Sequence, residues 1–202
     1  MMVGSVAGRV SASQSDEMGR WTLHKLRGSQ GKTITVITTY QVVDKHPKTA
    51  GPATAITQQY SMLMQKDSTD QPEKVRKHHC TDLLNKVKEC QELGDLLVVG
   101  GDFNEEIGFT NTGMSKLCTH CNLVDPFFNR HGTSNFATHN PGSRVIDYIL
   151  IDPRLQESVQ EIGYQSFSEN IISNHRGLYL DLDTTLFFGN NSTPVARMEH
   201  RD

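Results

Sequence analysis

The sequence predicts a mixed α/β protein built as one domain. Two segments rich in β-branched residues, Lys32–Tyr40 and Arg144–Asp152, have the composition of strands. The long segment Pro72–Leu93 carries apolar residues at helical spacing and has proline at its start, as amphipathic helices often do. A chain of 202 residues is long enough to bury one substantial core.

The first third of the chain is expected to begin without regular structure and then to form a hairpin. Residues 1–18 are small and polar, so we expect them to be disordered. A strand is predicted for Arg20–Gly28 and a stronger one for Lys32–Tyr40. The residues between them, Ser29–Gly31, suit a hairpin loop.

The middle of the chain is predicted to be helical and to end in a buried strand. Ala53–Lys66 has helical composition, and the helix predicted for Pro72–Leu93 meets a C-terminal stop at Gly94. Leu96–Gly100 is short, uncharged and bounded by glycine, which favours a strand covered on both faces.

The last third alternates between short elements. In order, the pattern predicts a short helix at Met114–Leu123, a polar loop at Asn129–Gly142, and strands at Arg144–Asp152, Val159–Gln165 and Leu178–Asp183. We therefore expect one domain over residues 19–188, followed by a flexible tail over residues 189–202.

Charge and cysteine content limit the classes of function. The net charge is −3, so any contact with nucleic acid should be local or metal-assisted rather than driven by bulk charge. Four cysteines are too few for a disulfide scaffold, and Cys118 and Cys121 lack a second ligand pair that would favour zinc. With no signal peptide and no apolar stretch of spanning length, we expect an intracellular protein, nuclear or cytoplasmic, without membrane contact and monomeric by default.

Polar side chains recur where predicted strands begin or end. Asp102 and Asn104 follow one strand, Asp147 lies inside an apolar strand, His175 precedes the last strand, and Tyr40 ends an early one. Each has a simpler interpretation on its own: a tight turn, an edge position, or a structural histidine or tyrosine. Because loops at strand ends are where ligands usually bind in α/β proteins, the set also predicts a site.

Together these residue types suit hydrolysis of a phosphoester, which needs an activated water, a neutralised phosphate and a stabilised leaving oxygen. Asp102 is the candidate that orients or deprotonates water. In an extended segment Asn104 would project to the same side as Asp102 and help to hold that water. His175, oriented through one ring nitrogen by Asp147, would present the other nitrogen to the phosphate.

Three short motifs resemble one known family. The stretches GGDFN (Gly100–Asn104), IDYIL (Ile146–Leu150) and SNHRG (Ser173–Gly177), in this order, resemble the endonuclease/exonuclease/phosphatase superfamily. The combination is most similar to endonuclease domains of non-LTR retrotransposons and to apurinic/apyrimidinic endonucleases. The resemblance covers residues 19–183.

The resemblance implies a four-layer α/β sandwich, with two mixed sheets flanked by helices, and cleavage of phosphodiester or phosphomonoester bonds with Mg²⁺ or Mn²⁺. It assigns Asp102 as the water-activating base and as a metal ligand, with Asn104 as its neighbour. His175, with Asp147 behind it, would contact the scissile phosphate. Tyr40 would sit near the phosphate or the leaving group. Among the neighbouring guanidinium groups, Arg144 and Arg176 are the candidates for phosphate binding.

Two departures from the family pattern bear on activity. That pattern begins upstream with an asparagine and a metal-carrying glutamate, and residues 1–18 are too few to supply those strands, so we expect an N-terminally truncated chain without its first strands. The family also has aspartate where this chain has Asn174, which should weaken binding of the metal ion at that position.

Three functions follow from these observations and stay open at this point. The first is a metal-dependent, retroelement-type DNA endonuclease. The second is a truncated remnant of the fold that is catalytically weak or inactive. The third is a phosphatase of the same fold that acts on a small phosphorylated molecule.

Overall fold

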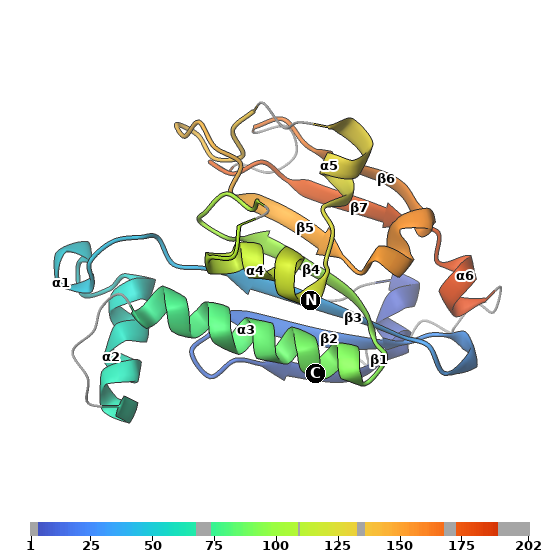
Figure 1. Cartoon of the computed structure of the whole chain (residues 1–202), viewed down its shortest axis with the longest axis horizontal. Helices are drawn as coiled ribbons and strands as arrows, with labels where there is room; N and C mark the ends of the chain where they lie inside the picture. The colour runs from blue at the N-terminus through green and yellow to red at the C-terminus, as the bar shows by residue number, and fades with distance from the viewer. Residues whose placement is uncertain (1–3, 68–73, 109, 133–135, 168–172, 190–202) are drawn as a thin grey trace, which may run out of the picture.

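The computed structural model describes residues 4–67, 74–108, 110–132, 136–167 and 173–189, and these form an α/β structure with two β-sheets (Figure 1). The larger sheet has five strands in the order β1-β2-β3-β4-β5, and the smaller pairs β6 with β7. The strands are β1 Val10–Ser15, β2 Trp21–Arg27, β3 Thr33–Tyr40, β4 Leu96–Asp102, β5 Asp147–Ile151, β6 Val159–Tyr164 and β7 Leu178–Leu182. The α-helices are α1 Pro47–Ala50, α2 Ala55–Asp67, α3 Lys74–Glu92, α4 Lys116–Cys121, α5 Pro126–His131 and α6 Thr185–Phe188. The predicted fold class, two sheets flanked by helices, is confirmed.

The centre of the larger sheet is the run β3-β4-β5. Strands β3 and β4 are parallel, and their register places Tyr40 opposite Asp102. Strand β5 runs antiparallel to β4, with Asp147 opposite Asp102. The carboxyl ends of β3 and β4 therefore meet the beginning of β5 at one edge of the sheet, although these residues lie far apart in the sequence.

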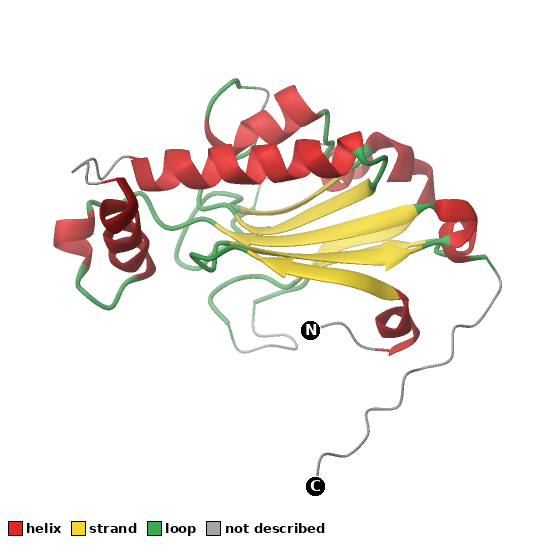
Figure 2. Cartoon of the chain, turned by 90° about the horizontal axis from the view of Figure 1, so that it is seen from below, coloured by secondary structure: helices red, strands yellow, loops and turns green. Residues whose placement is uncertain are grey.

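Helix α3 lies along one face of this sheet (Figure 2). Its buried stripe includes Leu83 and Val87, which pack in one core with Ile37 and Val99 of the sheet. Burying each such side chain stabilises the fold by about 1.5–3 kcal/mol. The helix ends because Gly94 adopts a φ of 82°, a left-handed conformation that glycine takes without strain.

The opposite face of the larger sheet meets the smaller sheet at one side. A second core there includes Leu26, Ile34, Ile151 and Leu155, with side chains of β6 and β7 packed against it. Figure 1 shows β6 and β7 beside β5, on the side away from β1. Within the part of the chain that the structure describes, no helix has the length and apolarity that crossing a membrane requires.

Two expectations for the elements were wrong, and a third is confirmed with narrower bounds. Residues 10–15, expected to be disordered, form strand β1, because pairing with β2 satisfies its backbone although its side chains are mostly exposed. The expected loop Asn129–Gly142 begins inside helix α5, which Asp125 caps by accepting hydrogen bonds from two backbone N–H groups while proline occupies the first turn. The strand expected over Arg144–Asp152 is shorter, Asp147–Ile151.

Other predicted elements are confirmed with shifted ends. Strand β4 extends two residues beyond Gly100 and so includes Asp102 itself. Helix α3 is described from Lys74, since the predicted first residues 72 and 73 lie outside the described residues. The tail predicted for residues 189–202 also lies outside them, apart from Gly189.

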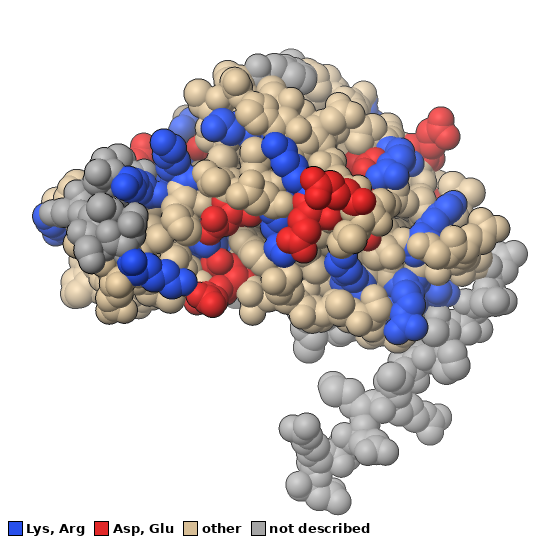
Figure 3. All heavy atoms as spheres, turned by 60° about the horizontal axis from the view of Figure 1, so that its bottom comes forward, with Lys and Arg blue, Asp and Glu red and all other residues tan. Residues whose placement is uncertain are grey.

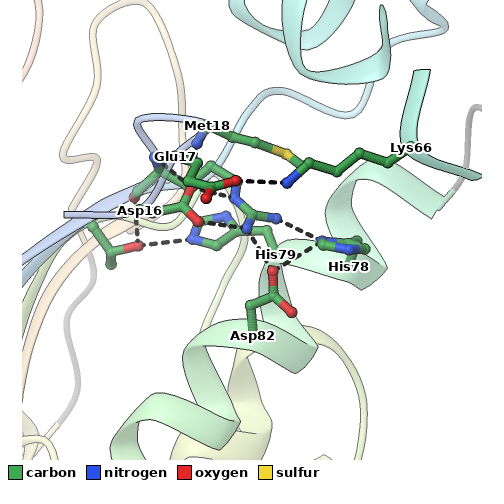
Figure 4. A network of polar contacts seen from close by, with 9 residues as sticks. Asp16, Glu17, Met18, Lys66, His78, His79 and Asp82 are labelled. Carbon is green, nitrogen blue, oxygen red and sulfur yellow. Dashed lines mark hydrogen bonds and ion pairs between the residues drawn. The ribbon is translucent and has the colours of Figure 1, made fainter. Parts of the chain in front are cut away.

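A buried arginine, Arg20, ties the start of the sheet to α3. Figure 4 labels its partners Asp16, His78 and Asp82. The Arg20 side chain is 2% exposed and donates hydrogen bonds to both carboxylate oxygens of Asp16, each over 2.7 Å, and to Oδ2 of Asp82 over 2.5 Å. Its Nη1 lies 2.8 Å from Nδ1 of His78. We call Arg20, Asp16, His78 and Asp82 the arginine cluster. Burial works to raise the pKa of Asp16, but the guanidinium of Arg20 holds that pKa below its usual value.

Beneath the arginine cluster lies a fully buried histidine. Nε2 of His79 is 3.0 Å from the Thr39 hydroxyl, whereas its Nδ1 has no hydrogen-bond partner among the described residues. Burial, together with the nearby charge of Arg20, lowers the pKa of His79 to about 3, so the ring is neutral at physiological pH.

Candidate active site

The candidate site begins where β3 and β4 approach one another closely. Gly101 has a φ of 150°, and a Cβ atom there would overlap the carbonyl oxygen of Thr39. Only glycine fits this position, because any side chain would push the two strands apart. Between the apolar Val99 and the acidic Asp102, strand β4 therefore passes very close to β3.

Asp102 and Asn104 hold each other directly. The backbone N–H of Asn104 donates to Oδ1 of Asp102 over 2.8 Å, and its side-chain Nδ2 lies 3.0 Å from Oδ2. The same Nδ2 donates to the carbonyl oxygen of Gln41 over 2.6 Å. The two side chains meet as predicted, but the predicted reason was wrong. The backbone turns at Asn104 into the left-handed region, with a φ of 47°, instead of continuing as an extended strand.

Asp147 and His175 also pair. Nδ1 of His175 lies 3.0 Å from one carboxylate oxygen of Asp147 and 3.1 Å from the other. The backbone of Asp147 is held in place, since the hydroxyl of Thr138 accepts the backbone N–H of Asp147 and Tyr164 donates its hydroxyl to the Asp147 carbonyl oxygen. A proton on Nδ1 of His175 satisfies this contact, which leaves Nε2 as the nitrogen available for a ligand.

The two pairs converge on one position. Asp102, Asp147 and His175 each offer a ligand atom, and these three atoms lie within 4.8 Å of one another. We call these three residues the acidic cluster. Among the described residues, Asp102 forms no ion pair and Asp147 forms one only with His175. In the described part of the chain, the cluster therefore concentrates negative charge, and no lysine or arginine forms an ion pair with it.

The pKa of Asp102 reflects this excess of negative charge. Burial raises the pKa of Asp102 above its usual value; the hydrogen bond from Asn104 opposes that shift, and the charge of Asp147 adds to it. Two carboxylates and an imidazole form a donor set that suits Mg²⁺ through oxygen ligands and Mn²⁺ through oxygen and nitrogen ligands. The residues present therefore fit the divalent cation that the sequence predicted.

Tyr40 lies beside Asp102 at the end of β3, with 41% of its surface exposed. Burial of its phenol, and the charge of Asp102, raise the pKa of Tyr40 above its usual value. The hydroxyl group thus remains protonated at neutral pH and can donate a hydrogen bond at the rim of the site.

The two predicted phosphate-binding arginines lie in different environments. Arg176 donates to the carbonyl oxygens of Ala137 and Gln165, over 2.9 and 3.3 Å, and stacks on the ring of Phe167 at 4.2 Å. It also lines a cavity of about 310 Å³ together with Asp102 and Asp147, so it borders the acidic cluster. Arg144 is exposed and extends from the loop before β5.

Asn174, the predicted weakened metal ligand, contacts a residue outside the acidic cluster. Its Nδ2 lies 3.0 Å from Nε2 of His139, and the His139 ring packs against the His175 ring with centroids 4.7 Å apart. Sequence reasoning missed the supporting roles of Thr138, Tyr164 and Gln41. No local pattern marks these three residues, because each contributes a contact to a distant segment.

No protein-family model matches the sequence, and no curated protein matches it. Solved structures do match. One is a 3′ phosphatase, NExo, from Neisseria bound to a product DNA hairpin, with 13% identity over 86% of this chain and 71% of that one and a TM-score of 0.59. The chain has the endonuclease/exonuclease/phosphatase fold. This confirms the fold predicted from the three motifs.

Two further structures have the same fold. The 3′-5′ exonuclease NExo from Neisseria meningitidis matches with 15% identity and a TM-score of 0.57, over 83% of this chain and 66% of that one. The human Nocturnin catalytic domain with a bound sulfate anion matches with 15% identity and a TM-score of 0.52, over 85% and 58%. This chain thus spans about three-fifths to seven-tenths of the length of these structures.

Proposed function

We propose that this chain hydrolyses phosphodiester bonds with a divalent cation at the acidic cluster. The observation that carries the proposal is the convergence of Asp102, Asp147 and His175 within 4.8 Å, at the meeting point of β4, β5 and the segment before β7. Among the described residues no lysine or arginine pairs with these carboxylates, so a bound cation has a physical reason to be there.

In this proposal the side chains of the site divide the chemistry between them, and the two carboxylates also hold the ion. Asp102, steadied by Asn104, orients the attacking water and accepts its proton. His175, fixed through Nδ1 by Asp147, donates from Nε2 to a phosphate oxygen, and Tyr40 donates its hydroxyl at the rim. Mg²⁺ or Mn²⁺, held by the carboxylates of Asp102 and Asp147, would supply neutralisation of the phosphate charge. Asn174 stays a candidate for a weaker, outer contact with that ion.

We propose DNA as the substrate, and a retroelement-type endonuclease as the finer assignment. The three motifs support the endonuclease assignment. A matching structure, a 3′ phosphatase bound to a product DNA hairpin, supports DNA as the substrate. A small or terminal phosphate is the second candidate. On the face shown in Figure 3, basic and acidic side chains are interspersed and do not form one basic surface.

The test is a cleavage assay in Mg²⁺ and in Mn²⁺. Purified protein is incubated with supercoiled plasmid, with an abasic duplex and with a 3′-phosphorylated oligonucleotide, beside the Asp102→Asn variant. Asp181→Asn is the matched control, because Asp181 is exposed on β7 and lies outside the acidic cluster. We expect Asp102→Asn to lower the rate by about 10²–10⁴-fold and Asp181→Asn to leave it unchanged. Equal rates for the wild-type and Asp102→Asn proteins would contradict the proposal.

A further inference from the structure

A short segment of the loop before β5, residues 137–140, runs antiparallel to the segment that carries His175. The backbone N–H of Arg176 donates to the carbonyl oxygen of Thr138 over 2.8 Å. A bridge in this pairing places His139 directly opposite His175, the histidine of the acidic cluster. The loop thus brings a second imidazole to the edge of the candidate active site.

Two consecutive residues of this loop contact the two members of the Asp147–His175 pair. Thr138 is fully buried, and its hydroxyl accepts the backbone N–H of Asp147 over 3.2 Å. The next residue, His139, packs its ring against the ring of His175, with centroids 4.7 Å apart and an angle of 56° between the planes. One short segment therefore supports both the carboxylate residue and the imidazole that it orients.

The ring of His139 is itself held in place. Nδ2 of Asn174 donates a hydrogen bond to Nε2 of His139 over 3.0 Å. The carbonyl oxygen of Asn174 also accepts the backbone N–H of Asn140 over 2.8 Å. Both the side chain and the backbone of Asn174 thus fix the position of His139 beside His175.

The contact with Asp147 alone leaves the ring of His175 free to turn. Nδ1 of His175 lies 3.0 Å from one carboxylate oxygen and 3.1 Å from the other, so the contact fixes this nitrogen without selecting one oxygen. The His175 side chain is also 29% exposed, so protein atoms do not enclose the ring. Rotation about Nδ1 displaces Nε2, and a displacement of about 1 Å at a reacting group can lower a rate by about 10²-fold.

We propose that His139 is a positioning residue, which packs on the ring of His175 and thereby keeps Nε2 of His175 directed at the phosphate. This inference rests on the proposed function. His139 contacts neither the substrate nor the ion in this proposal, and it acts only through His175. Its contribution should therefore appear in the rate of the chemical step and vanish when the imidazole of His175 is removed.

The first test is a double-mutant cycle in the cleavage assay with Mn²⁺. Values of kcat and KM are measured for the wild-type, His139→Ala, His175→Ala and doubly substituted proteins. His120→Ala is the matched control, because His120 is exposed on α4 and lies outside the acidic cluster. We expect His139→Ala to lower kcat by about 10–10²-fold with KM unchanged, and to cause no further loss in the His175→Ala protein. His120→Ala should change neither kcat nor KM.

A conservative variant tests whether packing of the ring is what matters. His139→Phe keeps an aromatic ring on His175 but cannot accept the hydrogen bond from Asn174. We expect its kcat to stay within about threefold of the wild-type value, because most of the packing between the rings remains. Equal losses for His139→Phe and His139→Ala overturn the inference. A raised KM with unchanged kcat, or the same loss with and without the His175 imidazole, also overturns it.

A measurement without substrate separates this inference from the proposed function. In protein labelled with ¹⁵N-histidine, the two ring nitrogens of His175 report its tautomer, and the spectrum of His175→Ala assigns them. We expect two distinct nitrogen shifts in the wild-type and His139→Phe proteins, and shifts averaged by ring motion in His139→Ala. Distinct shifts in all three proteins overturn the inference even where hydrolysis is confirmed. Averaged shifts in His139→Ala alone, without hydrolysis by any protein, support the positioning of the ring and contradict the proposed function.

Discussion

The arginine cluster and the acidic cluster border the same hydrophobic core but balance charge in opposite ways. In the arginine cluster, Arg20 is surrounded by Asp16 and Asp82, with an imidazole in contact. In the acidic cluster, Asp102 and Asp147 share one imidazole, and no arginine or lysine among the described residues pairs with them. In one cluster the charges are paired within the protein, whereas the other is the site at which we propose a bound cation.

This difference separates polar groups that stabilise the fold from those for which we propose a function. A buried charge that already has its partners fixes two segments to each other, here the β1–β2 turn and α3. Carboxylates that gather without a balancing charge lower stability and persist where they perform chemistry. Mutations in the arginine cluster should therefore lower the stability of the fold. Mutations in the acidic cluster should lower the rate of hydrolysis.

The largest effect is expected for His175→Ala in the acidic cluster. Removing the imidazole deletes the donor to the phosphate, so the hydrolysis rate should fall by about 10²–10⁴-fold. Initial rates with the best substrate of the cleavage assay give this value, and thermal melting gives the stability. A fully active His175→Ala variant would show that the chemistry lies elsewhere.

Arg20→Met, in the arginine cluster, should lower the stability of the protein. The change leaves the Asp16 carboxylate largely buried and without its bidentate partner, so the free energy of unfolding should fall by about 3 kcal/mol. Urea denaturation measures this loss. Lys66→Gln is the control, because Lys66 pairs with the exposed Glu17, and it should leave stability unchanged. Equal losses for the two variants would contradict the assignment of Arg20 as a buried structural residue.

A pH effect is expected from His79 beside the arginine cluster. The folded-state pKa of about 3 lies below the usual value of 6.5, so between these values the unfolded state binds the proton and the folded state does not. Stability should therefore be fully present above pH 6.5 and fall by up to about 1.4 kcal/mol per pH unit as the pH drops from 6.5 to 5. His79→Leu should flatten this dependence in urea titrations at about pH 7, 6 and 5. An unchanged slope would show that His79 is protonated in the folded protein.

The smallest effect is expected for Asn174→Asp. The family resemblance predicts that aspartate at this position raises the affinity for the metal ion. The Asn174 side chain, however, contacts His139 outside the acidic cluster. We therefore expect affinity for Mn²⁺ to rise by less than about tenfold. Calorimetric titration of Mn²⁺ into both proteins measures the difference. No change at all would show that position 174 does not face the ion.

Much of the site could be predicted from the sequence because its residues stand at strand ends. The β-branched runs identified β3 and β5, and the apolar run before Gly100 identified β4, which continues to Asp102. The pairing of His175 with Asp147 was predicted, since a carboxylate inside an apolar strand needs a partner. Strand pairing then brings these residues to one edge of the sheet.

The rest depends on contacts that local patterns do not encode. Strand β1 is polar and mostly exposed, and only its pairing with β2 defines it. The arginine cluster joins residues more than 50 positions apart, and its partners on α3 are spaced like ordinary surface residues of a helix. The left-handed turn at Asn104 also follows from tertiary contacts, including the hydrogen bond to the carbonyl oxygen of Gln41.

The proposed chemistry depends above all on the negative charge of the acidic cluster, which a divalent cation balances. Binding of Mn²⁺, followed by electron paramagnetic resonance in the wild-type, Asp102→Asn and Asp181→Asn proteins, measures this dependence without any substrate. We predict that the wild-type and Asp181→Asn proteins bind one ion with equal affinity, and that Asp102→Asn binds it at least about tenfold more weakly. Equal Mn²⁺ affinity in all three proteins would contradict a cation site at the acidic cluster.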